Sequence, residues 1–315
     1  MTPPSQLTDR TKRAQEKARV LNEALPWLTR WAGRTIVVKF GGNVGADSDE
    51  ALTAAFCSDV ALLRRVGLNV VVVHGGGPQI SALAERLGYE SRFVDGLRVT
   101  DQAMLEIVRM VLLGQVNPQL AGMIGAAGAA AVGVAGTDGG LVTAACRDDR
   151  LGFVGDVVSV DPAILRTLLS DGVIPVVATV ARGTGSDGRP QDYNVNADTV
   201  AGAIAVALAA DKLIYLSNVP GLYEDFGTID SSLLSEVGTS RLQAMLDKGE
   251  LHTGMVPKVR SVVDALAGGV ARAHLLDGRI EHALLLEIFT DEGIGTMVLP
   301  EPGLPAAPAI AVVRP

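Results

Sequence analysis

Short runs of apolar, largely β-branched residues recur along the chain and alternate with segments of helical periodicity. The runs occupy residues 36–38, 70–73, 173–180 and 213–216. A strand with one face in water alternates apolar and polar residues, whereas unbroken runs are typical of strands buried on both faces of a parallel sheet. The pattern therefore predicts an α/β fold, a three-layer αβα sandwich around a mainly parallel central sheet.

A segment before the first run has the periodicity of an amphipathic helix. Its apolar residues recur at helical spacing from Val20 to Trp31, and Pro26 is expected to kink it. Trp27 and Trp31 are the two tryptophans of the chain, and a leading helix has little surface of its own domain to bury them. We therefore interpret residues 1–33 as an extra N-terminal helix for oligomerisation, with a frayed leader as the alternative.

The composition argues against several classes of function. The chain has a formal net charge of -8 and a sequence pI of about 5.1, so it offers no basic field for a nucleic acid. Cys57 and Cys146 are too few for a disulfide framework. The uncharged stretch 110–137 is broken by Asn117 and Pro118, and we interpret it as a buried helix, a turn and a strand rather than a membrane span. The polar start resembles no secretion signal, so we expect a cytoplasmic protein with no nucleic-acid or membrane partner.

Two predicted strands end in glycine clusters. Residues 39–43 read Lys-Phe-Gly-Gly-Asn, and residues 74–78 read His-Gly-Gly-Gly-Pro. Glycine at the carboxyl end of a parallel strand, just before a helix, lets backbone N–H groups converge on an anion. The chain has no G-x-x-x-x-G-K-[ST] motif and neither cluster matches G-x-G-x-x-G, so a Walker-type ATPase and a nicotinamide enzyme are disfavoured. A tight turn is the alternative for either cluster alone.

Four charged residues stand where a local structural role explains them poorly. Lys39 ends an apolar strand, and Lys258 follows Pro257 in the first turn of a predicted helix, where the helix dipole disfavours a cation. Arg98 precedes another helix and offers a planar fork that suits a carboxylate. Asp198 lies near the start of an Ala-rich helix. The alternatives are a snorkelling lysine, an arginine in solvent and an aspartate that serves only the dipole.

Helix boundaries can also be placed. Asp47 or Ser48 is expected to cap a helix that ends at Gly67, and Thr100 another. Asp161 is expected to cap a third, with proline as its first residue.

Five motifs together resemble the amino acid kinase family, and within it the N-acetylglutamate kinases. They occupy residues 38–43, 74–78, 96–100, 193–198 and 254–258, and the likeness extends from about Leu21 to Val298. The resemblance implies a phosphotransferase with a carboxyl group as acceptor, which phosphorylates the γ-carboxylate of N-acetyl-L-glutamate. The product would be N-acetyl-L-glutamyl 5-phosphate, the second step of arginine biosynthesis, with ATP and Mg2+ as cofactors.

The resemblance also implies roles for individual residues. Lys39 and Lys258 would be catalytic and stabilise the phosphoryl group in transfer, while Asp198 would hold both lysines in position. The residues expected to bind N-acetylglutamate are Gly76, Gly77, Arg98 and Asn194, with Arg98 on the α-carboxylate. Phosphate contacts are expected from Gly41 and Gly42, and nucleotide contacts from Ser217, Asn218, Gly221 and Leu222.

The chemistry of this reaction requires no catalytic base. A γ-carboxylate has a reference pKa of about 4.3 and is already ionised at neutral pH. The obstacle is the repulsion between two anions, which lysines, backbone dipoles and Mg2+ relieve. His74 is therefore interpreted as structural. Asn218 stands where aspartate is common in the family, so no residue is assigned as a metal ligand.

The N-terminal helix and residues 273–278 and 286–293 resemble the arginine-inhibited branch of the family. In that branch such helices interlace dimers into a hexamer, a trimer of dimers. By this likeness L-arginine is the expected inhibitor, and the residues expected to line its site are Trp27, His274, Glu287 and Gly293. An indole in place of the usual tyrosine keeps a cation–π face. An ordinary network carboxylate is the alternative for Glu287.

We divide the chain into three parts. These are the N-terminal helix (1–33), an acetylglutamate-binding lobe (34–190) and an ATP-binding lobe (191–315), because the polar, glycine-rich stretch 182–192 is the best candidate for a hinge. Two other functions stay open: a kinase for another carboxylate, such as carrier-bound aminoadipate, and a non-catalytic arginine-sensing homologue.

Overall fold

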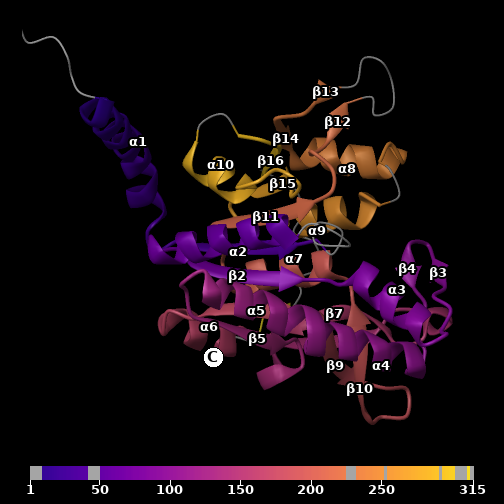
Figure 1. Ribbon diagram of the computed structural model, residues 1–315. Helices are drawn as coiled ribbons and strands as arrows, with labels where there is room; N and C mark the ends of the chain where they lie inside the picture. The colour runs from indigo at the N-terminus through magenta and orange to yellow at the C-terminus, as the bar shows by residue number, and fades with distance from the viewer. Residues whose placement is uncertain are drawn as a thin grey trace, which may run out of the picture.

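An eight-stranded sheet runs through the centre of the molecule in the computed structural model (Figure 1). Its strand order is β14-β16-β15-β11-β1-β2-β8-β5. Every neighbouring pair from β15 to β5 is parallel, and so is β14 with β16, whereas β15 and β16 are antiparallel. The strands are β1 (Thr35–Phe40), β2 (Asn69–His74), β5 (Ala131–Ala135), β8 (Ile174–Ala178), β11 (Lys212–Ser217), β14 (Glu236–Gly238), β15 (Ala273–Asp277) and β16 (Thr296–Leu299). The predicted mainly parallel central sheet is confirmed.

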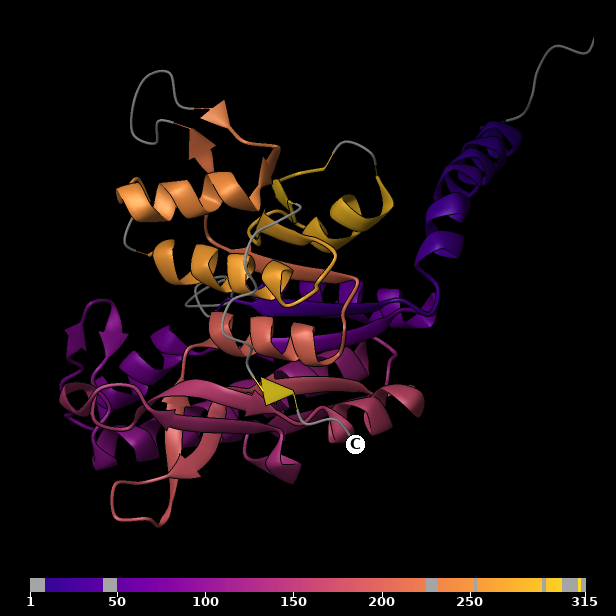
Figure 2. The same ribbon diagram turned by 180° about the vertical axis from the view of Figure 1, so that it is seen from behind.

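Helices cover both faces of this sheet (Figures 1 and 2). The structure describes residues 9–41, 50–224, 232–251, 254–290, 293–301 and 311–312. On one face lie α2 (Glu50–Arg65), α5 (Asn117–Ala126) and α10 (Ala283–Phe289). On the other lie α6 (Ala163–Ser170), α7 (Ala197–Ala207) and α9 (Val256–Ala267), with α8 (Thr239–Lys248) against α9. The predicted three-layer sandwich is therefore present.

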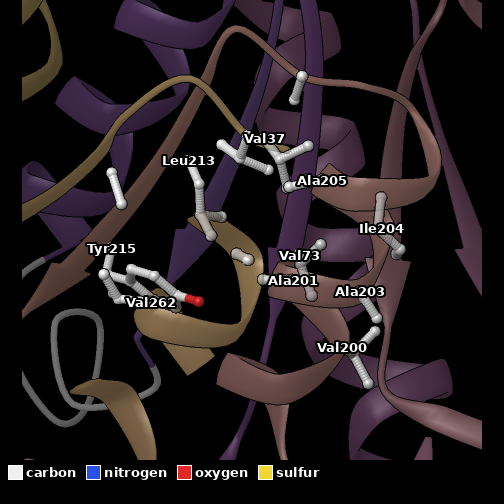
Figure 3. Close-up of a cluster of buried hydrophobic side chains, with 14 of the residues drawn as sticks. Val37, Val73, Val200, Ala201, Ala203, Ile204, Ala205, Leu213, Tyr215 and Val262 are labelled. Atoms are coloured by element: carbon white, nitrogen blue, oxygen red, sulfur yellow. The ribbon is translucent and has the colours of Figure 1, made fainter. Parts of the chain in front are cut away.

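The central strands supply side chains to two separate cores. In β1, Ile36 and Val38 pack on the α2 side, whereas Val37 packs on the α7 side, because successive side chains of a strand point to opposite faces. Figure 3 shows the core on the α7 side, where Val73 and Leu213 from the sheet lie among residues of α7. Both faces of the sheet are thus apolar, which explains the unbroken apolar runs in the sequence.

A smaller, five-stranded sheet has the order β10-β9-β6-β7-β17, and β10 also pairs with β7. Its strands are β6 (Val142–Cys146), β7 (Val154–Val160), β9 (Val180–Thr184), β10 (Pro190–Val195) and β17 (Ala311–Val312). The stretch 182–192, expected to be a hinge, is instead an antiparallel hairpin of β9 and β10. Its buried Asp192 accepts from Arg182 at 2.8 Å and lies 3.2 Å from Arg109 on α4, so paired charges fix this polar segment to the fold. The division of the chain at residue 190 stays a prediction.

Two of the expected helix starts can be compared with the structure. The helix α4 (Gln102–Val111) is capped by Asp101, whose carboxylate accepts the N–H of Met104 at 2.9 Å. Thr100, the expected cap, instead donates its hydroxyl to the carbonyl of Arg98, so that prediction is wrong by one residue. Asp161 accepts the N–H of Ala163 at 3.0 Å, but Pro162 is the N-cap and α6 begins at Ala163, so the expected cap and first residue are each one position too early. The other expected caps, at residues 47 and 48, lie outside the described residues.

The uncharged stretch 110–137 forms the elements expected of it. The helix α4 passes through a π-helical turn (Leu112–Val116) into α5, and a turn then leads to β5. No helix in the described part of the chain is both long and apolar enough to span a membrane. Short hairpins of β3 (Phe93–Val94) with β4 (Leu97–Arg98), and of β12 (Tyr223–Glu224) with β13 (Ser232–Leu233), complete the fold together with α3 (Gly77–Arg86).

The N-terminal helix α1 (Asp9–Trp31) projects away from the rest of the molecule in both views (Figures 1 and 2). It is one helix, with Pro26 inside it. At its end Trp31 is buried and Trp27 half-buried against the core on the α2 side. Further out, Val20, Leu21 and Leu25 are exposed, so α1 carries an apolar surface that this chain does not cover.

Candidate active site

Two lysines and one aspartate meet at the carboxyl end of β1. The Nζ atom of Lys39 lies 2.9 Å from Oδ1 of Asp198, and Nζ of Lys258 lies 3.1 Å from Oδ2 of the same carboxylate. The three side chains are only 12, 11 and 6% exposed for Lys39, Asp198 and Lys258. The structure therefore brings together the three residues that the sequence singled out as a catalytic group.

A different element delivers each of these residues. The strand β1 carries Lys39 on its α7 face. The side chain of Asn196 caps α7 by accepting the N–H of Asp198 at 2.8 Å, which puts Asp198 in the first turn. Pro257 likewise stands in the first turn of α9, next to Lys258. The positive ends of two helices and two ammonium groups thus converge on one carboxylate.

The pKa values of this group follow from burial and charge together. Burial alone would raise the pKa of Asp198, but the charges and hydrogen bonds of Lys39 and Lys258 outweigh it and lower the value to about 2. Burial lowers the pKa of Lys258 to about 8, although the attraction of Asp198 opposes this. At neutral pH the group has one negative and two positive charges, so an anion would complete its neutralisation.

A glycine loop connects β2 to α3 beside this group. A Cβ atom at Gly75 would lie 3.6 Å from Cβ of Ala197, so the loop packs on the first residue of α7. A Cβ atom at Gly76 would lie 2.7 Å from Cδ2 of Leu112, so a larger residue there would require the Leu112 side chain to move. Gly77 begins α3, whose N-terminus therefore opens at the same edge of the sheet.

Arg98 is fixed beside this loop. Its Nη2 donates to the carbonyl of Gly77 at 2.9 Å and to Oγ of Ser81 at 2.8 Å, and its Nη1 donates to Oγ of Ser91. Its guanidinium carbon lies 4.6 Å from the ring centroid of Phe93. The side chain is buried, and burial lowers the pKa of Arg98. Two residues predicted to bind substrate, Arg98 and Gly77, are therefore in direct contact.

Asn194 joins this substrate group to α7. Its Nδ2 donates to Oγ1 of Thr100 at 3.2 Å, and Thr100 in turn donates to the carbonyl of Arg98. Asn194 is the last residue but one of β10, two residues before the cap of α7. A chain of contacts therefore runs from Gly77 through Arg98 and Thr100 to the helix that carries Asp198.

The first glycine cluster differs from its expected role. The N–H of Gly41 donates to the carbonyl of Leu216 at 3.1 Å and so extends the pairing of β1 with β11. The expectation that Gly41 lends this N–H to a phosphate is therefore not met in this structure. Gly42 lies outside the described residues.

His74, at the end of β2, supports the glycine loop. Its Nδ1 lies 2.9 Å from the carbonyl of Gly75, and its Nε2 lies 2.9 Å from Nδ2 of Asn117. Asn117 also donates to the carbonyl of Val176. Burial lowers the pKa of His74 to about 4, although the Gly75 contact opposes this, so a neutral ring with a proton on Nδ1 fits both contacts. These contacts give His74 a structural role.

The residues predicted to contact a nucleotide lie together in the turn after β11. Ser217 ends that strand and is buried, whereas Asn218 is exposed. A Cβ atom at Gly221 would lie 2.6 Å from Oγ1 of Thr296, and the N–H of Leu222 donates to the same oxygen at 2.9 Å. This turn stands beside β1, because β11 and β1 are neighbours in the sheet.

Three residues of the predicted arginine site are also close together. Nδ1 of His274 on β15 lies 2.6 Å from Oε1 of Glu287 on α10, although the two atoms are not aligned as a hydrogen bond. Oε2 of Glu287 accepts the N–H of Ile294, and a Cβ atom at Gly293 would lie 3.6 Å from that oxygen. Burial alone would raise the pKa of Glu287, but the contact with His274, the N–H of Ile294 and the charge of Lys212 together outweigh it and lower the pKa.

A second indole, that of Trp31, is connected to this group through Lys212. Nζ of Lys212, the first residue of β11, lies 4.7 Å from the ring of Trp31. Burial lowers the pKa of Lys212 to about 8, while the charge of Glu287 opposes that change. The guanidinium carbon of Arg30 lies 5.6 Å from the ring centroids of both Trp27 and Trp31. The role of Trp27 in the arginine site stays a prediction.

Sequence reasoning missed Lys212, Tyr215 and Ser261. Lys212 lies at the start of an apolar strand, and Lys39 lies near the end of one. A lysine in such a strand is poorly explained by a local role, and this argument would have identified Lys212 as well. Tyr215 places a hydroxyl inside an apolar run, and a buried phenol usually has a partner. Ser261 lies in a helix and gave no signal of its own.

Comparisons with known proteins identify the family of this chain. The model of the amino acid kinase family matches residues 34–277. The acetylglutamate kinase of Acidothermus cellulolyticus is 50% identical over 293 residues, which covers 91% of this chain and 97% of that protein.

Among solved structures, the N-acetylglutamate synthase of Neisseria gonorrhoeae complexed with coenzyme A and N-acetyl-glutamate is 26% identical, with a TM-score of 0.76. The match covers 90% of this chain but only 63% of the synthase. The same synthase complexed with coenzyme A and L-arginine has a TM-score of 0.71 at 26% identity, over 90% of this chain and 65% of that one. By its family match and its sequence identity to the kinase, this chain belongs to the amino acid kinase family.

Proposed function

We propose that this protein transfers the γ-phosphoryl group of ATP to the γ-carboxylate of N-acetyl-L-glutamate. The product is N-acetyl-L-glutamyl 5-phosphate, and the reaction is the second step of arginine biosynthesis, in the cytoplasm. The relative from Acidothermus cellulolyticus is named for this activity and is half identical over almost its full length. Within this chain, the proposal depends on one observation: Lys39 and Lys258 share the buried carboxylate of Asp198.

The two lysines address the main obstacle of the reaction. A carboxylate and a nucleotide phosphate are both anions, so the barrier is electrostatic repulsion, and no proton has to be removed. Lys39 and Lys258 stabilise the negative charge on the oxygens between donor and acceptor, in a site where little water weakens the interaction. Asp198 holds both ammonium groups in place and does not act as a base, because its pKa is about 2.

The substrate end of the site is assigned to Arg98 and its neighbours. Three of the five N–H donors of the guanidinium are used by the bonds that fix it. The other two are left to bind the α-carboxylate. Gly76 and Gly77 let the substrate approach the backbone at the start of α3, and Asn194 completes the site from β10. This agrees with a division in which residues 34–190 form most of the substrate lobe.

ATP is assigned to the other half of the site, residues 191–315. We assign the contacts to the turn 217–222 and to the N-terminus of α9, which carries Lys258. We assign Mg2+ chiefly to the phosphates of ATP, the usual arrangement for this ion. Asp198 is already engaged by two lysines, and the described ranges contain no group of three or more histidine, cysteine or acidic side chains able to hold a metal ion.

We further propose that L-arginine inhibits the enzyme at the group formed by His274, Glu287 and Gly293. The carboxylate of Glu287 supplies a partner for a guanidinium, and the half-buried indole of Trp27, the residue predicted for this site, supplies a cation–π face. The exposed apolar face of α1 supports a homo-oligomer, a dimer or a hexamer as a trimer of dimers.

Trapping the acyl phosphate with hydroxylamine tests the proposed function. Purified protein is incubated with ATP, Mg2+ and one carboxylate at a time: N-acetylglutamate, glutamate, aspartate or aminoadipate. We expect hydroxamate with N-acetylglutamate at least tenfold above the others, and loss of the signal in Lys258→Ala. A stronger signal with another carboxylate would replace the proposed substrate, and no signal with any of them would favour a non-catalytic protein.

A further inference from the structure

A buried hydroxyl network lies next to the Lys39–Asp198–Lys258 group. Oγ of Ser261 donates to the backbone carbonyl of Asp198 at 2.7 Å. The hydroxyl of Tyr215 lies 2.6 Å from Oγ of Ser261 and 3.2 Å from the same carbonyl. Either hydroxyl can donate in the Tyr215–Ser261 contact, and Tyr215 also donates to the carbonyl of Asp198. Both side chains are buried, so neither hydroxyl exchanges these partners for water.

Tyr215 is also adjacent to both lysines. It is the register partner of Lys39 across the parallel pair of β11 and β1, so the two side chains leave the sheet on the same face. The Nζ atom of Lys258 lies 5.0 Å from the centroid of the Tyr215 ring. Figure 3 shows the tyrosine oxygen among the apolar side chains of this core. Burial raises the pKa of Tyr215 well above its ordinary value, which keeps the hydroxyl a donor.

The same residues set how closely α7 and α9 approach. A Cβ atom at Gly202 would lie 2.6 Å from Oγ of Ser261 and 3.2 Å from its carbonyl oxygen, so only glycine lets the two helices meet here. Gly202 follows Asp198 by four residues and Ser261 follows Lys258 by three, which puts each pair on one side of its helix. The helices are therefore joined twice, by the ion pair and by the hydroxyl network one turn further along.

We propose that Tyr215 and Ser261 are positioning residues for phosphoryl transfer. Their hydroxyls fix the first turn of α7 against α9, so that the ammonium of Lys258 stays on the carboxylate of Asp198 and at a set separation from Lys39. No proton is transferred through the network, because its role is to hold geometry. This inference rests on the proposed function, in which both lysines must face the transferring group.

Two variants remove the hydroxyls with little change of shape, Tyr215→Phe and Ser261→Ala. We expect kcat to fall about tenfold or more in each, because small displacements of catalytic groups are costly, while KM for ATP and N-acetylglutamate changes less than about threefold. The double variant should lose about as much as the worse single variant, because both hydroxyls act in one network. Tyr193→Phe is the matched control, since Tyr193 is also buried but donates to Thr184 in the β9–β10 hairpin.

A second measurement does not depend on turnover. Competitive labelling of lysines with acetic anhydride, read by mass spectrometry, reports how accessible and basic each amine is. We expect Lys258 to react at least about threefold faster in Ser261→Ala and Tyr215→Phe than in Tyr193→Phe, because the amine is held less firmly.

The outcomes separate the two proposals. A fall in kcat with faster Lys258 labelling, both absent in Tyr193→Phe, supports the positioning role. If kcat and labelling in both variants match Tyr193→Phe, the positioning role is refuted even where wild-type turnover is normal. If the wild type is inactive on N-acetylglutamate, the proposed function fails, and the Lys258 labelling rates still decide whether the hydroxyls hold the lysine.

Discussion

Replacing Asp198 by asparagine removes the one negative charge between two buried ammonium groups while keeping the size of the side chain. In the wild type the pKa of this carboxyl is lowered from 3.8 to about 2. That difference corresponds to about 2 kcal/mol in favour of the charged form. Loss of the charge also leaves Lys258 buried without its partner, and breaking a buried pair from one side costs about 3 to 5 kcal/mol. These are two estimates of one loss, so we expect Asp198→Asn to unfold more easily in urea by about 2 to 5 kcal/mol at pH 7.

Activity should fall far more than stability alone explains. Without Asp198 the pKa of Lys258 drops below its present value of about 8, so less of the ammonium form is present at neutral pH. The two lysines also lose the group that fixes their separation. We expect kcat to fall about 100-fold to 1000-fold in the hydroxylamine assay, in line with the loss of preorganised electrostatic groups elsewhere.

Asp192→Asn is the matched control for this prediction. Asp192 is as buried as Asp198, each at 8% exposure, and also lies between two cations, Arg182 and Arg109. Its loss should lower stability but leave kcat within about threefold, because it fixes a hairpin rather than the reacting groups. Equal losses of kcat in the two variants, or retention of a third of the turnover by Asp198→Asn, would refute the assigned role.

The pH dependence of the free energy of unfolding at acid pH tests the direction of the Asp198 pKa shift. A carboxyl whose folded pKa is lowered stabilises the fold above its unfolded pKa and loses that contribution as the pH falls through the folded value. The stability difference between wild type and Asp198→Asn should therefore shrink as the pH falls from about 4 to about 2.

Three further predictions follow from the site. An ammonium is charged below its pKa, so kcat/KM for ATP should be level near neutral pH and decline as Lys258, with a pKa of about 8, loses its proton; a flat profile to pH 10 would contradict this. Arg98→Lys should raise KM for N-acetylglutamate about tenfold or more, because an ammonium cannot reproduce the planar fork, whereas Arg182→Lys should leave that KM unchanged. Arginine at millimolar concentration should raise the thermal midpoint of unfolding of the wild type but not that of Glu287→Gln. The control Glu224→Gln removes an exposed carboxylate paired with Arg241, and its thermal midpoint should still rise with arginine.

Much of the fold could be predicted because its signals are local. The apolar run 70–73 is β2, buried on both faces, and residues 213–216 lie inside β11. A helix boundary was predicted one residue too early where two neighbouring residues can both act as a cap. Thr100 and Asp101 are such a pair, and only the backbone geometry at Asp101 directs a carboxylate to the first turn of α4. The polar stretch 182–192 looked like a linker, because the partners of its charges are found only in the folded chain.

The site residues were recognised by type and order, but their grouping could not be. Lys39 and Lys258 are more than 200 positions apart in the sequence, and nothing local says that one carboxylate lies between them. The use of the Gly41 N–H by Leu216 and the contact of Lys212 with Trp31 likewise depend on which strand and helix become neighbours.

The sequence by itself determined the layers of this protein, the strands that are buried on both faces and the residue types that can meet an anion, because periodicity and side-chain chemistry act over a few positions. The tertiary structure alone decided that α7 and α9 begin at the same point, that Gly202 lets them approach, and that Tyr215 and Ser261 lie next to the ion pair. Those contacts arise from packing of distant segments, and packing has no period that a sequence can show.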